Sequence, residues 1–154
     1  MPKIDIDALP EEGGSIYPAE FQPVVRGRFR RRLGRAGGLT QFGVNLCRLE
    51  PGAASSLRHW HESEDELVYV LDGEVVLVED EGETLLGPGD AASFKAGVAN
   101  GHHLVNRGER PALVLEVGTR AAVDRAHYAD VDMQVEKRDG RYRFTRRNGE
   151  PYPQ

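Results

Sequence analysis

Apolar residues recur along the chain in short runs that are separated by turn-forming residues. Between residues 40 and 47 they alternate with polar residues at the two-residue period of a strand. The dipeptide Asp72-Gly73 then separates two β-rich runs, 67–71 and 75–78, a pattern typical of a hairpin. No segment has a strong helical period, so the pattern predicts an all-β sandwich or barrel rather than βαβ units. Further strands are expected at 84–86, 91–94, 104–105 and 112–117.

The two ends of the chain differ from this central part. Residues 1 to about 22 carry prolines and glycines among acidic and small residues, which predicts an arm that lies over the core. After Gly118 we expect one short helical turn near Asp124 and Arg125, followed by a hairpin around Asp139-Gly140. We therefore divide the chain into an N-terminal arm (1–39), a barrel core (40–119) and a C-terminal extension with a β-hairpin (120–154).

Length and composition narrow the class of protein. A chain of 154 residues fits one compact domain. A net charge of −5 gives no overall attraction to nucleic acid or to an anionic membrane, so neither is an expected partner. Cys47 is the only cysteine, which excludes an intrachain disulfide and favours a reducing compartment. Without an apolar run of signal-peptide or membrane-spanning length, we expect a cytoplasmic protein.

Three residues around one predicted turn have the side chains and spacing of a metal site. His59 and His61 are two positions apart, so on a strand they project to the same side. Glu66 opens the following strand and can return its carboxylate to the two imidazoles. A polar strand next to a solvated acidic loop would have the same sequence pattern. The segment taken alone therefore fits a metal site and a solvated loop equally well.

The surroundings of these residues resemble the first conserved motif of the cupin superfamily, G-x5-H-x-H-x3,4-E-x6-G. The matching stretch runs from Gly52 to Gly73 and has one extra residue before His59. Glycines and ligand-type residues fall in the order of the motif. The resemblance therefore favours the metal-site interpretation over the solvated loop.

A second stretch, from Gly89 to Asn106, resembles the other cupin motif, G-x5-P-x-G-x2-H-x3-N. Lys95 stands where the proline is usual, and two extra residues precede His102. The spacing from His102 to Asn106 matches the motif, whereas His103 has no such partner and would point to the opposite face of a strand. We therefore choose His102 as the fourth ligand.

The resemblance, which covers roughly 40–119, implies a cupin double-stranded β-helix, a jelly-roll-like barrel, here with N- and C-terminal arms. It implies that four side chains point into this barrel and hold one divalent transition metal. Three imidazoles and one carboxylate suit Mn, Fe, Ni, Co or Zn better than Ca or Mg. It also suggests a homodimer, in which the terminal arms could cover sheet edges. The implied ligands are His59, His61, Glu66 and His102.

An open metal site favours an enzyme of the isomerase, lyase or dioxygenase type. Its substrate would be a small polar molecule that chelates the metal, such as a carboxylate or a sugar phosphate. Lys95 could bind the anionic group of that substrate, although a surface lysine explains it as well. No catalytic residue can be assigned. The alternative function is non-catalytic binding or sensing of a small ligand, since one barrel fold hosts many activities.

Other conspicuous residues have structural explanations. An arginine-rich run could grip an anion or nucleic acid, but a solvated edge balanced by the acidic N-terminal arm is favoured. Trp60 is expected to pack between sheets or subunits, His127 to be structural and Cys47 to be a buried, inert thiol. Glu62, Glu64 and Asp65 could support the ligands or form a solvated loop. The run comprises Arg26, Arg28, Arg30, Arg31, Arg32 and Arg35.

Overall fold

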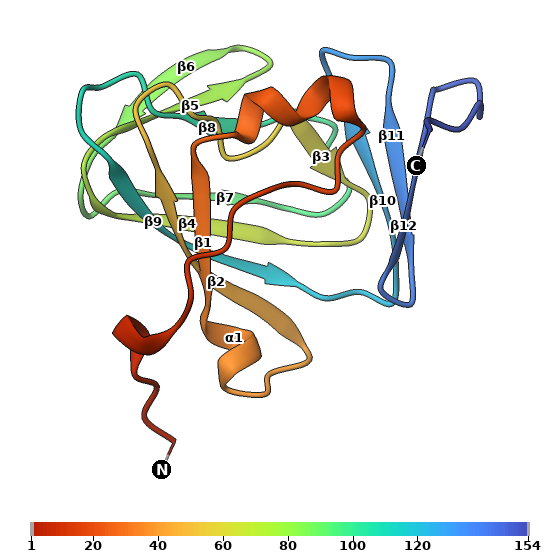
Figure 1. Cartoon of the computed structure of the whole chain (residues 1–154). Helices are drawn as coiled ribbons and strands as arrows, with labels where there is room; N and C mark the ends of the chain where they lie inside the picture. Colours follow the sequence, from red (N-terminus) through yellow and green to blue (C-terminus); the bar gives the residue numbers. More distant parts are fainter. Residues whose placement is uncertain (1, 154) are drawn as a thin grey trace.

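The chain folds into three antiparallel sheets in the computed structural model, which describes residues 2–153 (Figure 1). The five-stranded sheet has the order β1-β2-β9-β4-β7, and the three-stranded sheet has the order β6-β5-β8. The four-stranded sheet, β12-β11-β10-β3, stands at one side of these two in Figure 1. The strands are β1 (Arg28–Arg32), β2 (Phe42–Leu49), β3 (His59–His61), β4 (Glu66–Asp72), β5 (Val75–Glu79), β6 (Gly82–Leu86), β7 (Ala91–Phe94), β8 (His103–Val105), β9 (Ala112–Thr119), β10 (Val123–Tyr128), β11 (Gln134–Arg138) and β12 (Arg141–Thr145).

Helical structure is short throughout the described residues. The α-helix α1 (Leu33–Ala36) spans four residues, and 3-10 turns lie at Ile6–Ala8 and Ala19–Val25. No helix between residues 2 and 153 is long and apolar enough to cross a membrane. The fold is therefore all-β, as the two-residue periodicity predicted.

The main core lies between the five-stranded and three-stranded sheets. Alternate residues of β2, β4 and β9 point inward, and their registers place Cys47, Val114 and Val70 side by side across the sheet. From the facing sheet, Val75 and Leu77 of β5 pack into the same cluster. Because the side-chain period of a strand is two, the same register sends the residues between them to the outer face.

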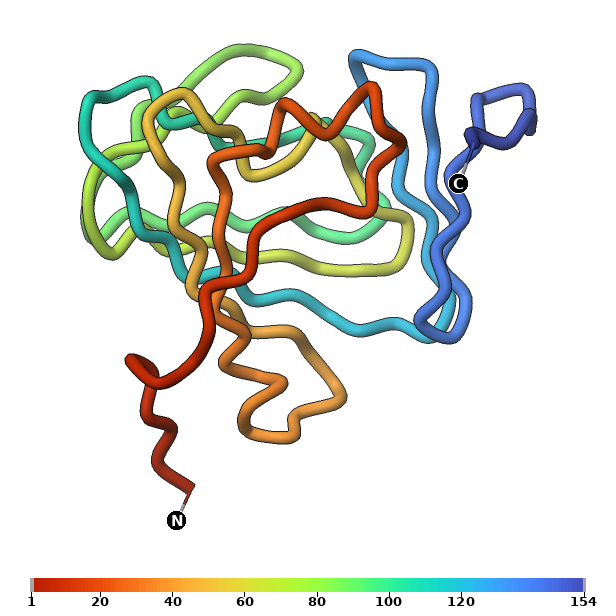
Figure 2. The backbone as a smooth tube through the Cα atoms, in the orientation of Figure 1, coloured from red at the N-terminus to blue at the C-terminus, as the bar shows by residue number. Residues whose placement is uncertain are grey.

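A second apolar cluster joins the two ends of the chain. Tyr17 of the N-terminal arm packs edge-on against Tyr128 of β10 and Phe144 of β12, with ring centroids 5.7 and 5.9 Å apart. Figure 2 shows the arm crossing the barrel to the C-terminal strands and then turning back towards β1. The arm thereby closes one side of the barrel with a core of its own.

Turn geometry confirms the predicted hairpin at Asp139-Gly140. The hairpin predicted at Asp72-Gly73 is wrong, because this turn leads from β4 in the five-stranded sheet to β5 in the three-stranded sheet, and the two strands do not pair. Gly73 has a positive φ of 73°, and a Cβ there would lie 2.7 Å from the Pro111 carbonyl oxygen, so only glycine fits this tight turn. At the confirmed hairpin Asp139 and Gly140 have φ values of 51° and 77°, the signs that a type I′ turn requires at both central residues. The Asp139-Gly140 turn joins β11 to β12.

Two strands were not predicted from the sequence. The helical turn expected near Asp124 and Arg125 is wrong, because these residues lie in β10, which pairs with β3 and β11. The segment 28–32, assigned to the N-terminal arm, forms the edge strand β1 and pairs with β2. Four of its five residues are arginines, so the apolar alternation that marks other strands is missing. We propose that the barrel begins at Arg28 rather than at residue 40.

The acidic arm balances the arginines that do not line the cavity, as expected. Arg32 contacts Glu12 at 2.7 Å, Arg48 contacts Glu11 at 2.7 Å, and Arg31 lies near both Asp7 and Glu11. The backbone of Glu12 also pairs with that of Arg30, which extends the sheet at the β1 edge. Covering an edge strand in this way blocks pairing with other chains.

Candidate metal centre

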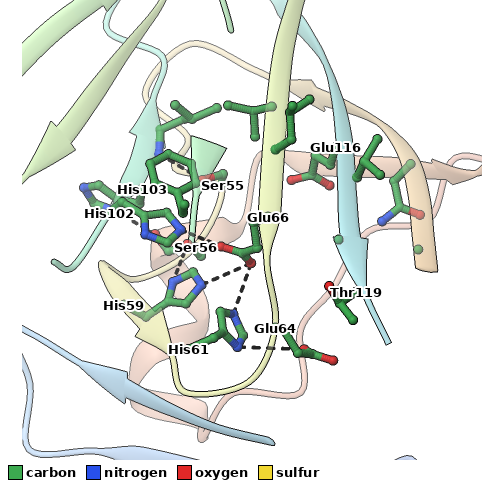
Figure 3. A pocket seen from close by; sticks show the side chains of 18 of the residues that line it. Ser55, Ser56, His59, His61, Glu64, Glu66, His102, His103, Glu116 and Thr119 are labelled. Atoms are coloured by element: carbon green, nitrogen blue, oxygen red, sulfur yellow. Dashed lines mark hydrogen bonds and ion pairs between the residues drawn. The ribbon is translucent and has the colours of Figure 1, made fainter. Parts of the chain in front are cut away.

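The side chains of His59, His61, His102 and Glu66 converge at one place inside the barrel (Figure 3). One carboxylate oxygen of Glu66 lies 3.1 Å from His61 Nε2 and 3.6 Å from His59 Nε2. The other lies 2.5 Å from His102 Nε2. Three ring nitrogens of the same type therefore face one carboxylate.

Strand pairing explains this convergence. His59 and His61 lie two residues apart on β3 and project to the same side. An isolated bridge pairs His59 with His102, whose backbones exchange hydrogen bonds of 2.9 and 3.1 Å. Glu66 opens β4 on the inner face of the five-stranded sheet, with Gly118 opposite it on β9. The absence of a side chain at Gly118 keeps space beside the Glu66 carboxylate.

Hydrogen bonds orient two of the three imidazoles. His59 Nδ1 lies 2.8 Å from the Leu57 carbonyl oxygen, which can only accept, so Nδ1 carries the proton. His61 Nδ1 lies 2.6 Å from the Asp124 carboxylate, which also accepts a hydrogen bond from the backbone N–H of Ser63. In both rings this leaves Nε2 directed at the cluster, the arrangement that metal-ligating histidines use.

The electrostatics of the cluster follow from its contacts. Burial raises the pKa of Glu66, but hydrogen bonds from the three histidines outweigh it and hold the pKa well below its usual value. For His61, burial lowers the pKa, yet the hydrogen bonds to Asp124 and Glu66 raise it to about 10. Burial lowers the pKa of His102. At neutral pH a His61 imidazolium thus lies between two carboxylates, next to a neutral His102.

The chemistry of these donors fits a divalent transition metal. Three Nε2 atoms and one carboxylate form a mixed nitrogen and oxygen donor set, which suits Mn, Fe, Co, Ni or Zn. The His102 ring lies flat against Phe94, with centroids 3.6 Å apart and planes 1° apart, so its orientation is fixed by packing. Its Nδ1 is buried and has no hydrogen-bond partner among residues 2–153. The residues present could therefore hold such an ion through four side chains.

A second pair of charged residues lies next to the cluster. Glu64 Oε1 is 3.8 Å from His61 Nδ1, and the Glu64 carboxylate also contacts the ammonium of Lys137 on β11. The side chains of Glu64 and Lys137 are 12% and 11% exposed, so the pair is largely shielded from solvent. Glu64 is thus a supporting residue of the site and not part of a solvated loop, whereas Glu62 pairs with His127.

A cavity of about 370 Å³ opens in front of the cluster. The four convergent side chains form one part of its wall, and the inner faces of β1, β2 and β9 form another. Arg30 and Glu116 lie on that second wall as a bidentate pair, with contacts of 2.7 and 3.2 Å. A volume of this size matches that of small-ligand pockets in general. The wall also includes Arg28, Asn45, Ser55, Ser56 and Lys137.

The other residues named from the sequence take different positions. Lys95 is exposed and lines a separate cavity of about 220 Å³, which reaches the same cluster from the side of His61 and His102. His103 Nδ1 contacts the Ser56 carbonyl oxygen at 2.8 Å and not Glu66. Trp60 stacks on His127, with ring centroids 4.4 Å apart.

Sequence reasoning missed the residues that support the cluster from other strands. Asp124 and Lys137 come from the C-terminal extension, and Arg28 and Arg30 come from a segment interpreted as a solvated edge. Arg28 and Arg30 turn inward because they alternate with the outward Arg31 along β1. The two-residue spacing of the arginines was the available signal.

Comparisons with known proteins agree with this geometry. The cupin domain family model matches residues 45–118. The crystal structure of a sugar phosphate isomerase of the cupin superfamily from Silicibacter pomeroyi superposes with a TM-score of 0.96; it is 51% identical, over 99% of this chain and 97% of that one. A search of the curated proteins found no match.

More distant structures share the same architecture. A protein proposed to be a sugar phosphate isomerase, from Acidithiobacillus ferrooxidans, is 26% identical with a TM-score of 0.84, over 97% of this chain and 93% of that one. A polyketide cyclase from Streptomyces resistomycificus is 23% identical with a TM-score of 0.64, over 77% of this chain and 79% of that one. At that identity the cyclase shows a common fold alone.

Proposed function

This chain belongs to the cupin superfamily, and we propose that it is a metal-dependent enzyme acting on a small polar substrate that chelates the metal. The observation that carries the proposal is the convergence of three imidazole Nε2 atoms on the Glu66 carboxylate at the wall of a cavity. Of the isomerase, lyase and dioxygenase types, we favour an isomerase of sugar phosphates, because the 51% identical neighbour carries that description.

The proposed ligands are His59, His61, Glu66 and His102. When bound, a divalent ion would polarise carbonyl and hydroxyl oxygens of the substrate. Asp124 holds the His61 ring in place through Nδ1, and Phe94 holds the His102 ring by stacking. These contacts fix the donor atoms before any ion arrives, which lowers the entropy cost of binding.

An isomerase also needs a group that moves a proton, and we propose Glu64 for that role. Of the three carboxylates on the cavity wall, Glu66 is a proposed ligand and Glu116 is held by Arg30. Glu64 also contacts a cation, Lys137, but it lies beside the proposed ligands, with Oε1 3.8 Å from His61 Nδ1, where it could accept a proton from a bound substrate. Glu64→Gln should lower kcat with little change in metal content, whereas an equal kcat would remove Glu64 from the mechanism.

Elemental analysis of the purified protein tests the metal proposal. We expect close to one Mn, Fe, Co, Ni or Zn per chain in the wild type and a large loss in His102→Ala. His103→Ala is the matched control, since this neighbouring histidine contacts a backbone carbonyl instead of Glu66. Negligible metal in the wild type after reconstitution with each ion would overturn the proposal. A barrel that binds a small ligand without catalysis would then be the better interpretation.

Turnover of sugar phosphates by the metal-loaded protein tests the enzyme proposal separately. Aldose and ketose phosphates can be screened by NMR, where interconversion appears as new anomeric and keto signals. Lys95→Gln belongs in the same screen, because we retain Lys95 as a proposed substrate contact at the second cavity. A higher KM in this variant would support that role, and unchanged kinetics would leave Lys95 a surface residue.

We propose a second copy of this chain as the partner that covers the outer face of the five-stranded sheet. Leu67, Tyr69 and Leu71 of β4 are 42%, 39% and 42% exposed and alternate with the buried Val68 and Val70. The registers place apolar residues of β9 and β2 beside them on the same face, namely Val44, Leu46, Leu115 and Val117.

The size of this outer apolar face supports a dimer. With Phe42, also 42% exposed, its most exposed side chains present roughly 300 Å² of apolar surface, before the partly exposed residues between them are added. Apolar patches of about 300 Å² or more are often functional, and a stable interface uses about 800 Å² from each partner, so the dimer would bury the neighbouring residues of this face as well. The arginines on this face, Arg31 and Arg48, are paired with Glu11 of the arm, and the apolar part of the face could pack against its own copy about a two-fold axis.

A further inference from the structure

We infer that Arg28 is the residue that binds the anionic group of the ligand, a phosphate or a carboxylate, inside the large cavity. The inference deepens the proposed function and rests on it for the ligand's identity, but the anion site itself can be tested without metal. It follows from the position of Arg28 on the cavity wall, its hydrogen bonds and the balance of charge around it.

Arg28 is a buried cation without a carboxylate partner. Arg28 is 9% exposed, and no Asp or Glu between residues 2 and 153 lies within ion-pair distance of its guanidinium. Its guanidinium donates to two backbone carbonyls, 2.8 Å to Ser55 and 3.0 Å to Gly14. A guanidinium has five N–H donors, so these two bonds leave donors free at the cavity wall. Burying a charge without a partner is costly, which makes the position unusual for a purely structural arginine.

Charge on the cavity wall is otherwise paired. Arg30 is neutralised by Glu116, and Lys137 is neutralised by Glu64. Arg120 also lacks a carboxylate partner among the described residues, but it is exposed, so water solvates its charge. Arg28 is therefore the one buried, uncompensated charge on the wall, and an anion entering the cavity would complete the pairing.

Two cations meet at Ser55. Arg30 Nη2 lies 3.4 Å from the Ser55 carbonyl oxygen that Arg28 also contacts, so the two guanidiniums are close together. Burial, and then the charge of Arg30, lower the pKa of Arg28. An anion beside Arg28 would offset both the burial of its charge and its repulsion by Arg30. The oxygens of the anion could accept hydrogen bonds from the planar guanidinium group.

The position of Arg28 suits a ligand that also reaches the metal cluster. Ser55, which holds the Arg28 guanidinium, is followed by Ser56, whose Oγ lies 3.2 Å from His59 Nδ1 (Figure 3). Both Arg28 and the four proposed ligands line the same cavity. A small molecule with an anionic group at one end and metal-binding oxygens at the other can therefore contact both. Exposed Lys95 lines the other cavity and does not provide this arrangement.

Titration of metal-free protein with inorganic phosphate tests the inference. Protein stripped with chelator is titrated with phosphate, and separately with acetate, by calorimetry or by 31P line width for phosphate. We expect saturable phosphate binding to the wild type and at least tenfold weaker binding to Arg28→Gln, because a charge-assisted contact is lost. The two anions distinguish a phosphate-selective site from a general carboxylate site.

Arg120→Gln is the matched control, since it removes the same charge from the exposed part of the same cavity wall. We expect less than a twofold change in phosphate affinity. Equal weakening by Arg28→Gln and Arg120→Gln would indicate a diffuse charge effect and overturn the inference, as would a wild type that binds neither anion. Zinc titration of each variant is a separate readout of the metal cluster, so failure of the anion site and failure of the metal site can be told apart.

A structural role for Arg28 is tested by two further measurements. Arg28 holds the Gly14 and Ser55 backbones together, so Arg28→Gln could also lower the melting temperature. Arg28→Lys keeps the charge, and it should retain part of the phosphate binding even where its stability is reduced. In the wild type, phosphate should shift the Arg28 Nε–H resonance, and an unmoved resonance at saturating phosphate would assign Arg28 a structural role only.

Discussion

The hydrogen bond from His61 to Asp124 gives the sharpest test of how the cluster is organised. Asp124 is 5% exposed, and its two carboxylate oxygens accept from His61 Nδ1 at 2.6 Å and from the Ser63 backbone N–H at 2.9 Å. Asparagine has the same shape but only one acceptor oxygen. In Asp124→Asn, therefore, either the bond to His61 or the bond to Ser63 is lost.

The expected cost follows from the role of such contacts. Loss of a carboxylate that orients a ligating histidine typically lowers metal affinity by about 10- to 100-fold. Asp124→Asn should therefore weaken zinc or cobalt binding by about that factor, measured by competition with a chromophoric chelator at constant pH. Asp130→Asn is the matched control, because Asp130 pairs with Arg58 away from the cluster.

Two results would refute this reasoning. An unchanged affinity in Asp124→Asn would mean that the ring of His61 needs no anchor or is not a ligand. An equal loss in Asp130→Asn would mean that the effect comes from general destabilisation of the C-terminal extension. Melting temperatures of both variants without metal separate the contribution to folding from the contribution to binding.

Three further expectations concern protonation, the thiol and the outer sheet face. In metal-free protein the pKa of His61 is raised from 6.5 to about 10, so its stabilising contribution is full below about pH 6.5 and is lost as the pH rises towards 10. The melting temperature should fall across that pH window, and it should fall more weakly in Asp124→Asn. An equal fall of the melting temperature with pH in both proteins would contradict the assignment. Burial raises the pKa of the Cys47 thiol to about 12, so alkylation at pH 8 should be at least 100-fold slower in folded than in denatured protein, and comparable rates would contradict its burial. Leu67→Glu should convert the proposed dimer to monomer in light scattering, whereas Leu85→Glu, at a 61% exposed position of β6, should not; a monomeric wild type would remove the dimer proposal.

Local sequence patterns were sufficient for most of the fold. Alternation of apolar and polar residues located β2, and two β-rich runs located β4 and β5. Two Asp-Gly dipeptides located turns, of which Asp139-Gly140 closes a hairpin and Asp72-Gly73 connects two sheets. These features depend on residues adjacent in sequence, because side-chain period and turn conformation are local properties of the backbone. Spacing also brought His59, His61 and Glu66 together as one group, and the motif resemblance added His102, which the structure places 2.5 Å from Glu66.

The supporting part of the site was decided only by tertiary structure. Asp124 reaches His61 because β10 pairs with β3 across more than sixty residues of chain, and nothing near Asp124 in sequence marks that partner. Likewise, Arg28 and Arg31 belong to one basic run, yet one faces the cavity and the other faces the acidic arm. A strand of arginines carries no apolar alternation to show its inner face. Which face of β1 is inside depends on the sheet that it joins through β2, and the inner face of that sheet is the one on which strands distant in sequence pack.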